Sequence, residues 1–391
     1  MIKKKNLDIK KFPKSRLKKI VKGISNEISE TVLRCKKIII KFSKIQRKII
    51  RKWIDIYRWI YNFTIKYTRT SKMKSFYTLR KEIKESFTYG QKEYIYQMPS
   101  HILDQAINDV VKSYKTCMSN KKEGNIKRFR LRYKKKISNI QTICIPSEYF
   151  SKNKNSFVYS KLGIINSSES IKNIKQTCRL TWNKKNNIFI LNIPVEKEKY
   201  KVGNREEICS IDPGIRTFQT LYSKKYISEF GKDIYKEIGT KIDKIENKKE
   251  NEGTKWYRKY STRLYDKIKH KIEDLHWKTS LDLVKSFDTI LVGNMSTQRI
   301  CQGNLNKKVK CIANMFSHYK FNLRLQQKAE QYGAKIIMVN EAYTSKTCGK
   351  CLKRNEKLGG NKKFKCPSCG FTWDRDYNGA RNIMMRYFGI F

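Results

Sequence analysis

The chain of 391 residues is long enough for two or three domains, and its 88 Lys and Arg against 34 Asp and Glu give a formal net charge of +54. Such self-repulsion predicts a polyanionic partner, DNA or RNA. A membrane-surface or ribosomal-type protein is the alternative, but no apolar run approaches the roughly 18 residues of a spanning helix, so we expect no membrane partner.

Residues 1–36 indicate a basic N-terminal arm that is too charged for a secretory signal. The eleven cysteines are an odd number, and seven of them are scattered without a pairing pattern. We therefore expect a reducing, intracellular compartment.

The first half begins with a short β-prone run at 37–42, followed by apolar residues at helical spacing from Gln46 and again over Ser100–Met118. These helices predict a helical subdomain over 45–122. The aromatic residues of the first helix fit its core better than a base-stacking platform, although the second interpretation stays open.

From residue 123 basic residues alternate with apolar or aromatic ones, which is typical of a strand with one charged face. Further strands are expected at Ser156–Tyr159, Gln176–Trp182 and Ile188–Ile193. The pattern predicts a small β module that ends in a charged stretch at 196–206.

The second half opens with a buried strand that leads to Asp212, a Pro-Gly turn and a second antiparallel strand. A long helical region follows over 233–286. The remaining expected elements are a strand at Thr289–Val292, a helix at Met315–Tyr332, a strand from Ala334 and a last helix from about Tyr377. Strands interleaved with helices predict an α/β sheet covered on both faces.

Two CxxC pairs, Cys348 with Cys351 and Cys366 with Cys369, have the spacing of a zinc ribbon. Four thiolates close a tetrahedron and leave no open coordination position. The spacing therefore predicts a structural zinc ion, and any catalysis has to be sought elsewhere.

Two acidic residues, Asp374 and Asp376, stand directly behind the cysteines, at the start of the last helix. They could cap this helix, since aspartate is a preferred capping residue. Together with Asp212 at the end of a buried strand, they could also hold Mg²⁺, as paired carboxylates do in two-metal nucleases.

Three motifs carry a family resemblance: DPGIR from Asp212, YTSKTC from Tyr343 with the two CxxC pairs, and DRDYNGARNI from Asp374. They resemble the split RuvC nuclease of TnpB-type proteins, the transposon-encoded, RNA-guided relatives of type V CRISPR effectors. Weaker similarity extends over 315–333 and 37–62, and the resemblance is densest after residue 206.

The resemblance implies an RNase H-like RuvC domain of residues 206–345 and 372–391, interrupted by a zinc ribbon at 346–371. Before it, the resemblance implies a β-barrel-like wedge module of residues 37–44 and 123–205. The helical segment 45–122 then becomes a recognition insert.

The first and third catalytic acids of the family carry over to Asp212 and Asp376, with Asp374 as a neighbour. The second acid is missing, because the strand that should end in it reads TILV followed by Gly293. Glu341 follows the neighbouring expected strand and could replace it, since adjacent strands lie about 4.8 Å apart. It could also be an exposed loop acid. A relocated glutamate resembles Fanzor, the eukaryotic and viral branch of these proteins.

Proteins of this family hold a guide (omega) RNA whose pairing opens double-stranded target DNA beside a short flanking motif. The resemblance therefore implies an RNA-guided DNA endonuclease of a transposon-type element, monomeric in its ribonucleoprotein, with Mg²⁺ held by Asp212, Glu341 and Asp376. It also implies that the protein is located in the nucleus or in a viral replication compartment. A catalytically inactive, guide-bound DNA-binding regulator is the rival, supported by Gly293. No histidine is assigned to catalysis, and His276 is expected to pack.

Overall fold

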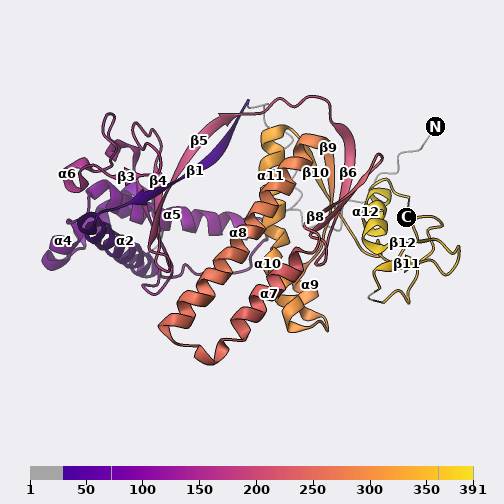
Figure 1. Cartoon of the computed structure of the whole chain (residues 1–391). Helices are drawn as coiled ribbons and strands as arrows, with labels where there is room; N and C mark the ends of the chain where they lie inside the picture. Colours follow the sequence, from indigo (N-terminus) through magenta and orange to yellow (C-terminus); the bar gives the residue numbers. More distant parts are fainter. Residues whose placement is uncertain (1–29, 72, 360, 391) are drawn as a thin grey trace. The chain divides into compact units, whose positions relative to one another are not determined.

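The computed structural model describes residues 30–390 except 72 and 360, and it divides at Lys197 into two compact units (Figure 1). Most of the expected basic arm, up to residue 29, lies outside the described residues. Strand β1 begins at Thr31, so the boundary of the arm at residue 36 was wrong, and residues 31–36 belong to the first sheet.

The first unit combines one sheet with helices, and its strands have the order β2-β4-β5-β1-β3. Its elements are β1 (Thr31–Lys41), α2 (Lys44–Thr70), α3 (Phe76–Glu85), α4 (Tyr89–Ile95), α5 (Ser100–Lys122), β2 (Ile140–Ile145), the 3-10 helix η2 (Ser147–Tyr149), α6 (Tyr159–Leu162), β3 (Asn166–Ser167), β4 (Cys178–Asn183) and β5 (Ile188–Glu198).

Helix α2 begins at a capping box in which the Ser43 and Gln46 side chains bond each other's backbone amides. It buries Trp53 and Tyr57, each 1% exposed, in a core shared with α5 and the sheet. The aromatic residues of this helix are therefore core residues, as expected. Because helices and strands share one core, the expected helical insert and β module form a single compact unit.

The alternating segment after residue 123 is not a strand before Ile140, contrary to expectation. Side chains of α2 bond its backbone instead: the Asn62 amide oxygen accepts from Lys134 N at 2.7 Å, and Arg69 donates to Leu131 O at 3.2 Å. The strand expected at Ser156–Tyr159 was also wrong. Phe157 forms only an isolated bridge, and Tyr159 begins α6.

The second unit contains a five-stranded sheet of order β10-β9-β6-β7-β8 and a separate hairpin of β11 and β12. Its elements are β6 (Glu206–Pro213), β7 (Gln219–Ser223), β8 (Ile227–Phe230), α7 (Ile234–Glu246), the 3-10 helix η3 (Lys249–Asn251), α8 (Lys255–Ser286), β9 (Phe287–Gly293), α9 (Thr297–Gln302), α10 (Lys307–Phe316), α11 (His318–Tyr332), β10 (Lys335–Val339), β11 (Lys363–Lys365), β12 (Thr372–Asp374) and α12 (Arg375–Tyr387).

Both faces of this sheet are covered, as the sequence predicts. Ile211 and its neighbour in the adjacent strand, Val292, face a core built with α7, α8, α10 and α11. Leu291 points the other way and packs against Ile383 of α12. Because strand side chains alternate between faces, the short buried run of β9 supplies both cores.

The helix expected at Met315–Tyr332 begins only at His318, and Met315 and Phe316 end the preceding helix α10. Ser317 takes a left-handed backbone conformation, with φ of 48°, and separates α10 from α11. No helix within the described part of the chain is both long and apolar enough to cross a membrane.

Candidate active site

The carboxyl ends of three neighbouring strands gather acidic side chains at one edge of the second sheet. Strand β6 runs parallel to β9, and β9 runs parallel to β10, with Ile211 beside Val292 and Gly293 beside Val339. Asp212 therefore stands at the end of β6, and Glu341 stands two residues beyond β10. The arrangement follows from topology, since parallel strands end at the same edge.

Asp212 is the centre of this acidic group. Its removal from water raises the pKa of its carboxyl well above the usual value, and the negative charges of Glu341 and Asp376 raise it further. Glu341 and Asp376 therefore each lie within electrostatic reach of Asp212. Such a group favours a proton or a cation between its members.

Asp376 and Asp374 have different positions at the start of α12. The Asp374 side chain caps the helix and accepts from Asp376 N at 2.8 Å. Partial burial and the Asp374 charge raise the pKa of Asp376, while Lys362, Arg375 and Arg216 lower it. The capping interpretation thus fits Asp374, and Asp376 is free to face the acidic group.

Gly293 closes β9 at the position where the family's second acid is expected. A Cβ atom there would lie 3.0 Å from Glu341 Oε2, 2.9 Å from Ile383 Cδ1 and 3.0 Å from Pro213 Cδ. The Glu341 carboxylate therefore occupies the space that a side chain at residue 293 would enter. Because glycine has no side chain, residue 293 leaves that space to the Glu341 carboxylate.

Two residues that the sequence did not single out position Asp212 against α12. Gly379 faces the Asp212 carboxylate so closely that a Cβ atom at residue 379 would clash with Oδ2. The Ser210 hydroxyl donates to Ala380 O at 2.7 Å and fixes the helix to β6. A glycine inside a predicted helix was the available signal, because it costs helix stability and needs a packing reason.

The four predicted cysteines come together as a second possible metal site. The Sγ atoms of Cys348 and Cys369 are 3.6 Å apart and those of Cys351 and Cys366 are 3.5 Å apart. Of the residues that the structure describes, only these four form a group of three or more metal-ligand side chains with all ligand atoms within 4.8 Å. This cluster could bind zinc, and the more widely spread carboxylates form no group this tight.

The thiols of the metal-free cluster interact, so that the pKa of Cys366 is lowered whereas the pKa values of Cys348 and Cys369 are raised. Desolvation raises the pKa of the Cys366 thiol, but hydrogen bonds, first those from the Cys369 and Ser368 backbone amides, together outweigh this and lower the pKa to about 6. Thiolates are the form in which cysteine binds zinc.

The cysteine cluster is tied to α12 by two buried asparagines of the DRDYNGARN motif. Asn378 accepts from Gly349 N at 3.0 Å and donates to Thr347 O at 2.8 Å. Asn382 donates to the carbonyls of Thr344 and Thr347 at 2.8 and 2.7 Å. The helix that carries Asp376 is therefore anchored to the loop that carries Cys348.

His276 is a packing residue, as expected. Its Nε2 lies 2.9 Å from Phe316 O and its Nδ1 lies 3.0 Å from the Arg324 guanidinium, while its ring stacks on Phe218. Burial, reinforced by the Arg324 charge, lowers its pKa to about 3. A neutral, enclosed imidazole of this kind supports structure.

The comparisons with known proteins agree with the motifs of the site. A family model described as "Cas12f1-like, TNB domain" matches residues 318–383, from α11 to α12. A TnpB-like protein of Acanthamoeba polyphaga mimivirus is 31% identical over 378 residues, which cover 89% of this chain and 72% of that protein. This chain belongs to the TnpB-like family. The predicted membership in the TnpB and type V effector superfamily is confirmed.

Two further matches are more distant. The CRISPR-associated endodeoxyribonuclease Cas12f1 of Sulfoacidibacillus thermotolerans is 36% identical over 70 residues, which cover 17% of this chain and 16% of that protein. The solved structure of a Cas12f1-sgRNA-target DNA complex matches with a TM-score of 0.51 at 14% identity and covers 91% of this chain and 99% of that one. This structural match shows a shared mixed α/β fold.

Proposed function

We propose that this TnpB-like protein is an RNA-guided, Mg²⁺-dependent DNA endonuclease whose second unit is a RuvC nuclease domain. The observation that carries the proposal is the group of Asp212, Glu341 and Asp376 around one sheet edge. Family membership supports it, and so do Cas12f1 relatives that are endodeoxyribonucleases by name.

The donor set fits Mg²⁺, which prefers carboxylate oxygens and a site that keeps room for water. Burial is the main cause of the raised pKa of Asp212, and the charges of Glu341 and Asp376, which add to it, are charges that a cation would neutralise. Asp212, Glu341 and Asp376 would hold the metal. When bound, Mg²⁺ supplies Lewis acidity and an activated water for phosphodiester hydrolysis.

Glu341 is the proposed replacement for the missing acid. Its carboxylate fills the space beside Gly293, so it approaches the acidic group from the neighbouring strand end. This relocation also supports assignment to the Fanzor branch. The catalytically inactive, guide-bound regulator remains the alternative function, since β9 itself ends without an acid.

The decisive test is an exchange of the acid between the two strand ends. Glu341→Gln should lower Mg²⁺-dependent cleavage by about 10³-fold or more while leaving RNA and target binding within about twofold, because only the metal site changes. Glu341→Ala combined with Gly293→Glu should recover a small part of the activity, since the first change removes the Glu341 carboxylate from beside residue 293, while Ile383 and Pro213 still crowd the new Cβ atom. Cleavage by Glu341→Gln at the wild-type rate would exclude this role.

A single variant serves as the control that distinguishes a relocated acid from steric crowding at residue 293. Gly293→Glu alone retains Glu341 and should be less active than the double variant, because the new side chain meets the Glu341 carboxylate. If the single variant is the more active of the two, the acids do not share one site.

The proposed partners are a guide (omega) RNA and a double-stranded DNA target with a flanking motif, bound by one protein copy. The charge of +54 supports polyanionic partners. We further propose structural zinc at Cys348, Cys351, Cys366 and Cys369 and a nuclear or viral-replication location. Sequencing the copurified RNA tests the guide: one structured species is expected, and random cellular RNA would contradict it.

A further inference from the structure

The segment after α5 presents an apolar strip to the helices and a cationic strip to solvent. Residues 121–136 contain nine Lys and Arg but only one Glu. Arg128, Arg130 and Arg132 are exposed, whereas Phe129 and Leu131 between them are half-buried. The period-two pattern thus builds a two-sided extended segment without a neighbouring strand.

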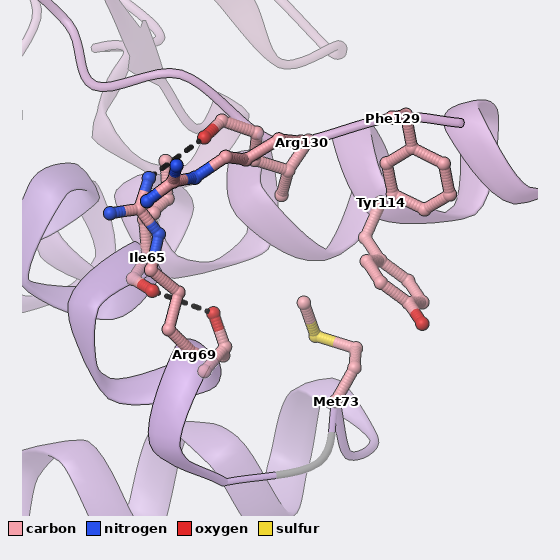
Figure 2. Close-up of a pocket in the computed structure, with 8 residues that line it drawn as sticks. Ile65, Arg69, Met73, Tyr114, Phe129 and Arg130 are labelled. Carbon is pink, nitrogen blue, oxygen red and sulfur yellow. Dashed lines mark hydrogen bonds between the residues drawn. The ribbon is translucent and has the colours of Figure 1, made fainter.

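A pocket of about 360 Å³ lies where this segment crosses the ends of α2 and α5. Figure 2 shows Tyr114 and Phe129 on one side, Ile65 and Arg69 on the other, and Met73 below the opening. The volume is within the roughly 300–1,000 Å³ range of small-molecule pockets. The pocket offers flat apolar surfaces beside positive charge.

The two aromatic rings form the stacking surface. The ring centroids of Tyr114 and Phe129 are 5.5 Å apart at an interplanar angle of 70°, an edge-to-face arrangement that covers one face of one ring and leaves the other faces uncovered by this pair. The Tyr114 hydroxyl has no hydrogen-bond partner among the described residues and could bond the edge of a base. Both rings are half-buried and line the pocket, and a ring face together with a polar group suits a nucleobase.

The two arginines of the pocket differ. Arg69 is fixed, because its guanidinium bonds Leu131 O at 3.2 Å and the Tyr133 hydroxyl at 2.8 Å and lies 4.3 Å from the Tyr133 ring centroid. Arg130 has no ion pair or hydrogen bond to any residue that the structure describes. A free guanidinium at the rim can bind the phosphate next to a bound base.

We propose that this pocket binds the unpaired base of a single-stranded RNA segment, with the ring against Tyr114 and Phe129 and the adjoining phosphate on Arg130. RNA is the favoured occupant because its loops present unpaired bases, whereas a DNA duplex must first be opened. An acidic peptide would match the charge but would leave the ring faces without a flat partner. The proposal deepens the proposed function by locating an RNA contact outside the nuclease unit.

Binding experiments with charge-matched probes test the base contact. Fluorescence anisotropy on the full chain, stripped of copurified RNA and kept free of Mg²⁺, would compare a uridine 12-mer, an abasic ribose-phosphate 12-mer and a thymidine 12-mer. We expect the uridine probe to bind about tenfold more tightly than the abasic probe, since one stacked base contributes on the order of a factor of ten. Tighter binding of the thymidine probe would overturn the assignment to RNA.

Matched variants locate the contact. Tyr114→Leu and Phe129→Leu keep apolar volume but remove the rings, and each should reduce the uridine-to-abasic ratio at least about threefold. Tyr77→Leu removes an exposed ring outside the pocket and should leave the ratio unchanged. Arg130→Gln should weaken both probes more than Arg128→Gln does. An unchanged ratio in both ring variants would exclude a base in this pocket.

Photocrosslinking provides a second measurement. A probe containing 4-thiouridine should crosslink to Tyr114 or Phe129 in the intact protein, and mass spectrometry would identify the peptide. Crosslinks confined to other segments would also overturn the proposal. None of these measurements requires cleavage. The binding and crosslinking results can therefore contradict the RNA site while the nuclease proposal stands, and the reverse is also true.

Discussion

Gly379 shows how one residue can position the Asp212 side chain through the atoms that it lacks. It lies in α12 with the Asp212 carboxylate directly against it, where a methyl group would overlap Oδ2. The glycine weakens the helix, by about 1 kcal/mol relative to alanine, but it lets α12 approach β6 closely. Asp376 and Asp212 thereby come within electrostatic reach of each other.

Gly379→Ala should therefore lower the free energy of unfolding by about 1–3 kcal/mol through overpacking and reduce cleavage at least about tenfold by displacing Asp212. Denaturant unfolding and cleavage rates measure the two effects. Gly90→Ala in α4 is the matched control, because it adds the same methyl group with no atom within 4 Å. That control should be neutral or slightly stabilising. Equal effects of both variants would contradict the contact.

The raised pKa of Asp212 predicts a pH dependence of the Mg²⁺-free protein. The pKa of Asp212 in the folded protein lies well above its unfolded value of about 3.9, so the folded state binds this proton more tightly. The resulting stabilisation is complete at pH values below the unfolded pKa and is lost as the pH rises through the folded pKa. Within this window the free energy of unfolding should fall by about 1.4 kcal/mol per pH unit for this one proton. Asp212→Asn should remove that slope, and Mg²⁺ should oppose the loss.

This prediction is checked by denaturant unfolding at several pH values in zinc-containing, Mg²⁺-free buffer. Asp282→Asn, at an exposed position of α8 outside the site, serves as the control and should keep the slope. A slope that Asp212→Asn leaves intact would assign the proton to another group.

The sequence predicted which carboxylates meet but not how they are held. Asp212 and Glu341 follow buried β-prone runs, and parallel neighbours must end together, so their proximity follows from pattern and topology. The Gly379 contact depends on the packing distance between a helix and a strand. No local pattern encodes that distance.

At the scale of elements, long periodic segments were predictable because each carries its own apolar stripe. Helix α2 matches its expected segment for this reason, whereas the short strands β4 and β9 were predictable as apolar, β-prone runs. The structure of the alternating segment before Ile140 was not predictable. Alternation indicates an extended chain with one apolar and one polar side, but a strand also needs a hydrogen-bonded neighbour. Here Asn62 of α2 bonds the backbone instead.

The link between the cysteine cluster and α12 predicts what zinc loss does. Chelation, or Cys366→Ser, should free the loop that Asn378 and Asn382 hold and so loosen the helix that carries Asp376. Cleavage should be lost together with protease resistance after residue 343, because structural zinc contributes directly to folding free energy.

Metal analysis, limited proteolysis and cleavage assays measure this coupling. Cys311→Ser changes a free cysteine outside the cluster and is the control. Full cleavage by protein without zinc would show that the helix keeps its position independently.

At the scale of the whole molecule, charge decides the strength of nucleic-acid binding more than any single contact. A formal charge of +54 spreads cations over both units. Each neutralised phosphate releases condensed counterions, so binding has to weaken steeply with salt. Bulk charge selects no sequence, so in the proposed function sequence specificity comes from pairing with the guide RNA.

Affinity for a non-specific DNA duplex should therefore fall about 10³-fold or more between 50 and 200 mM salt. Binding isotherms of the Glu341→Gln variant without Mg²⁺ measure the slope without degradation of the probe. A chain with several Lys-to-Gln changes on one face should show a shallower slope. A nearly flat salt dependence would contradict a phosphate-dominated interface.

The space shared by Gly293 and Glu341 bears on how degenerate nucleases are recognised. A comparison that considers one alignment position at a time would classify Gly293, at the end of β9, as an inactivating substitution. A metal ion binds a carboxylate oxygen according to its position in space, whichever strand carries the residue. An acid lost at one alignment position can therefore be replaced by an acid at another. Inventories of inactive homologues should therefore be scored on three-dimensional position.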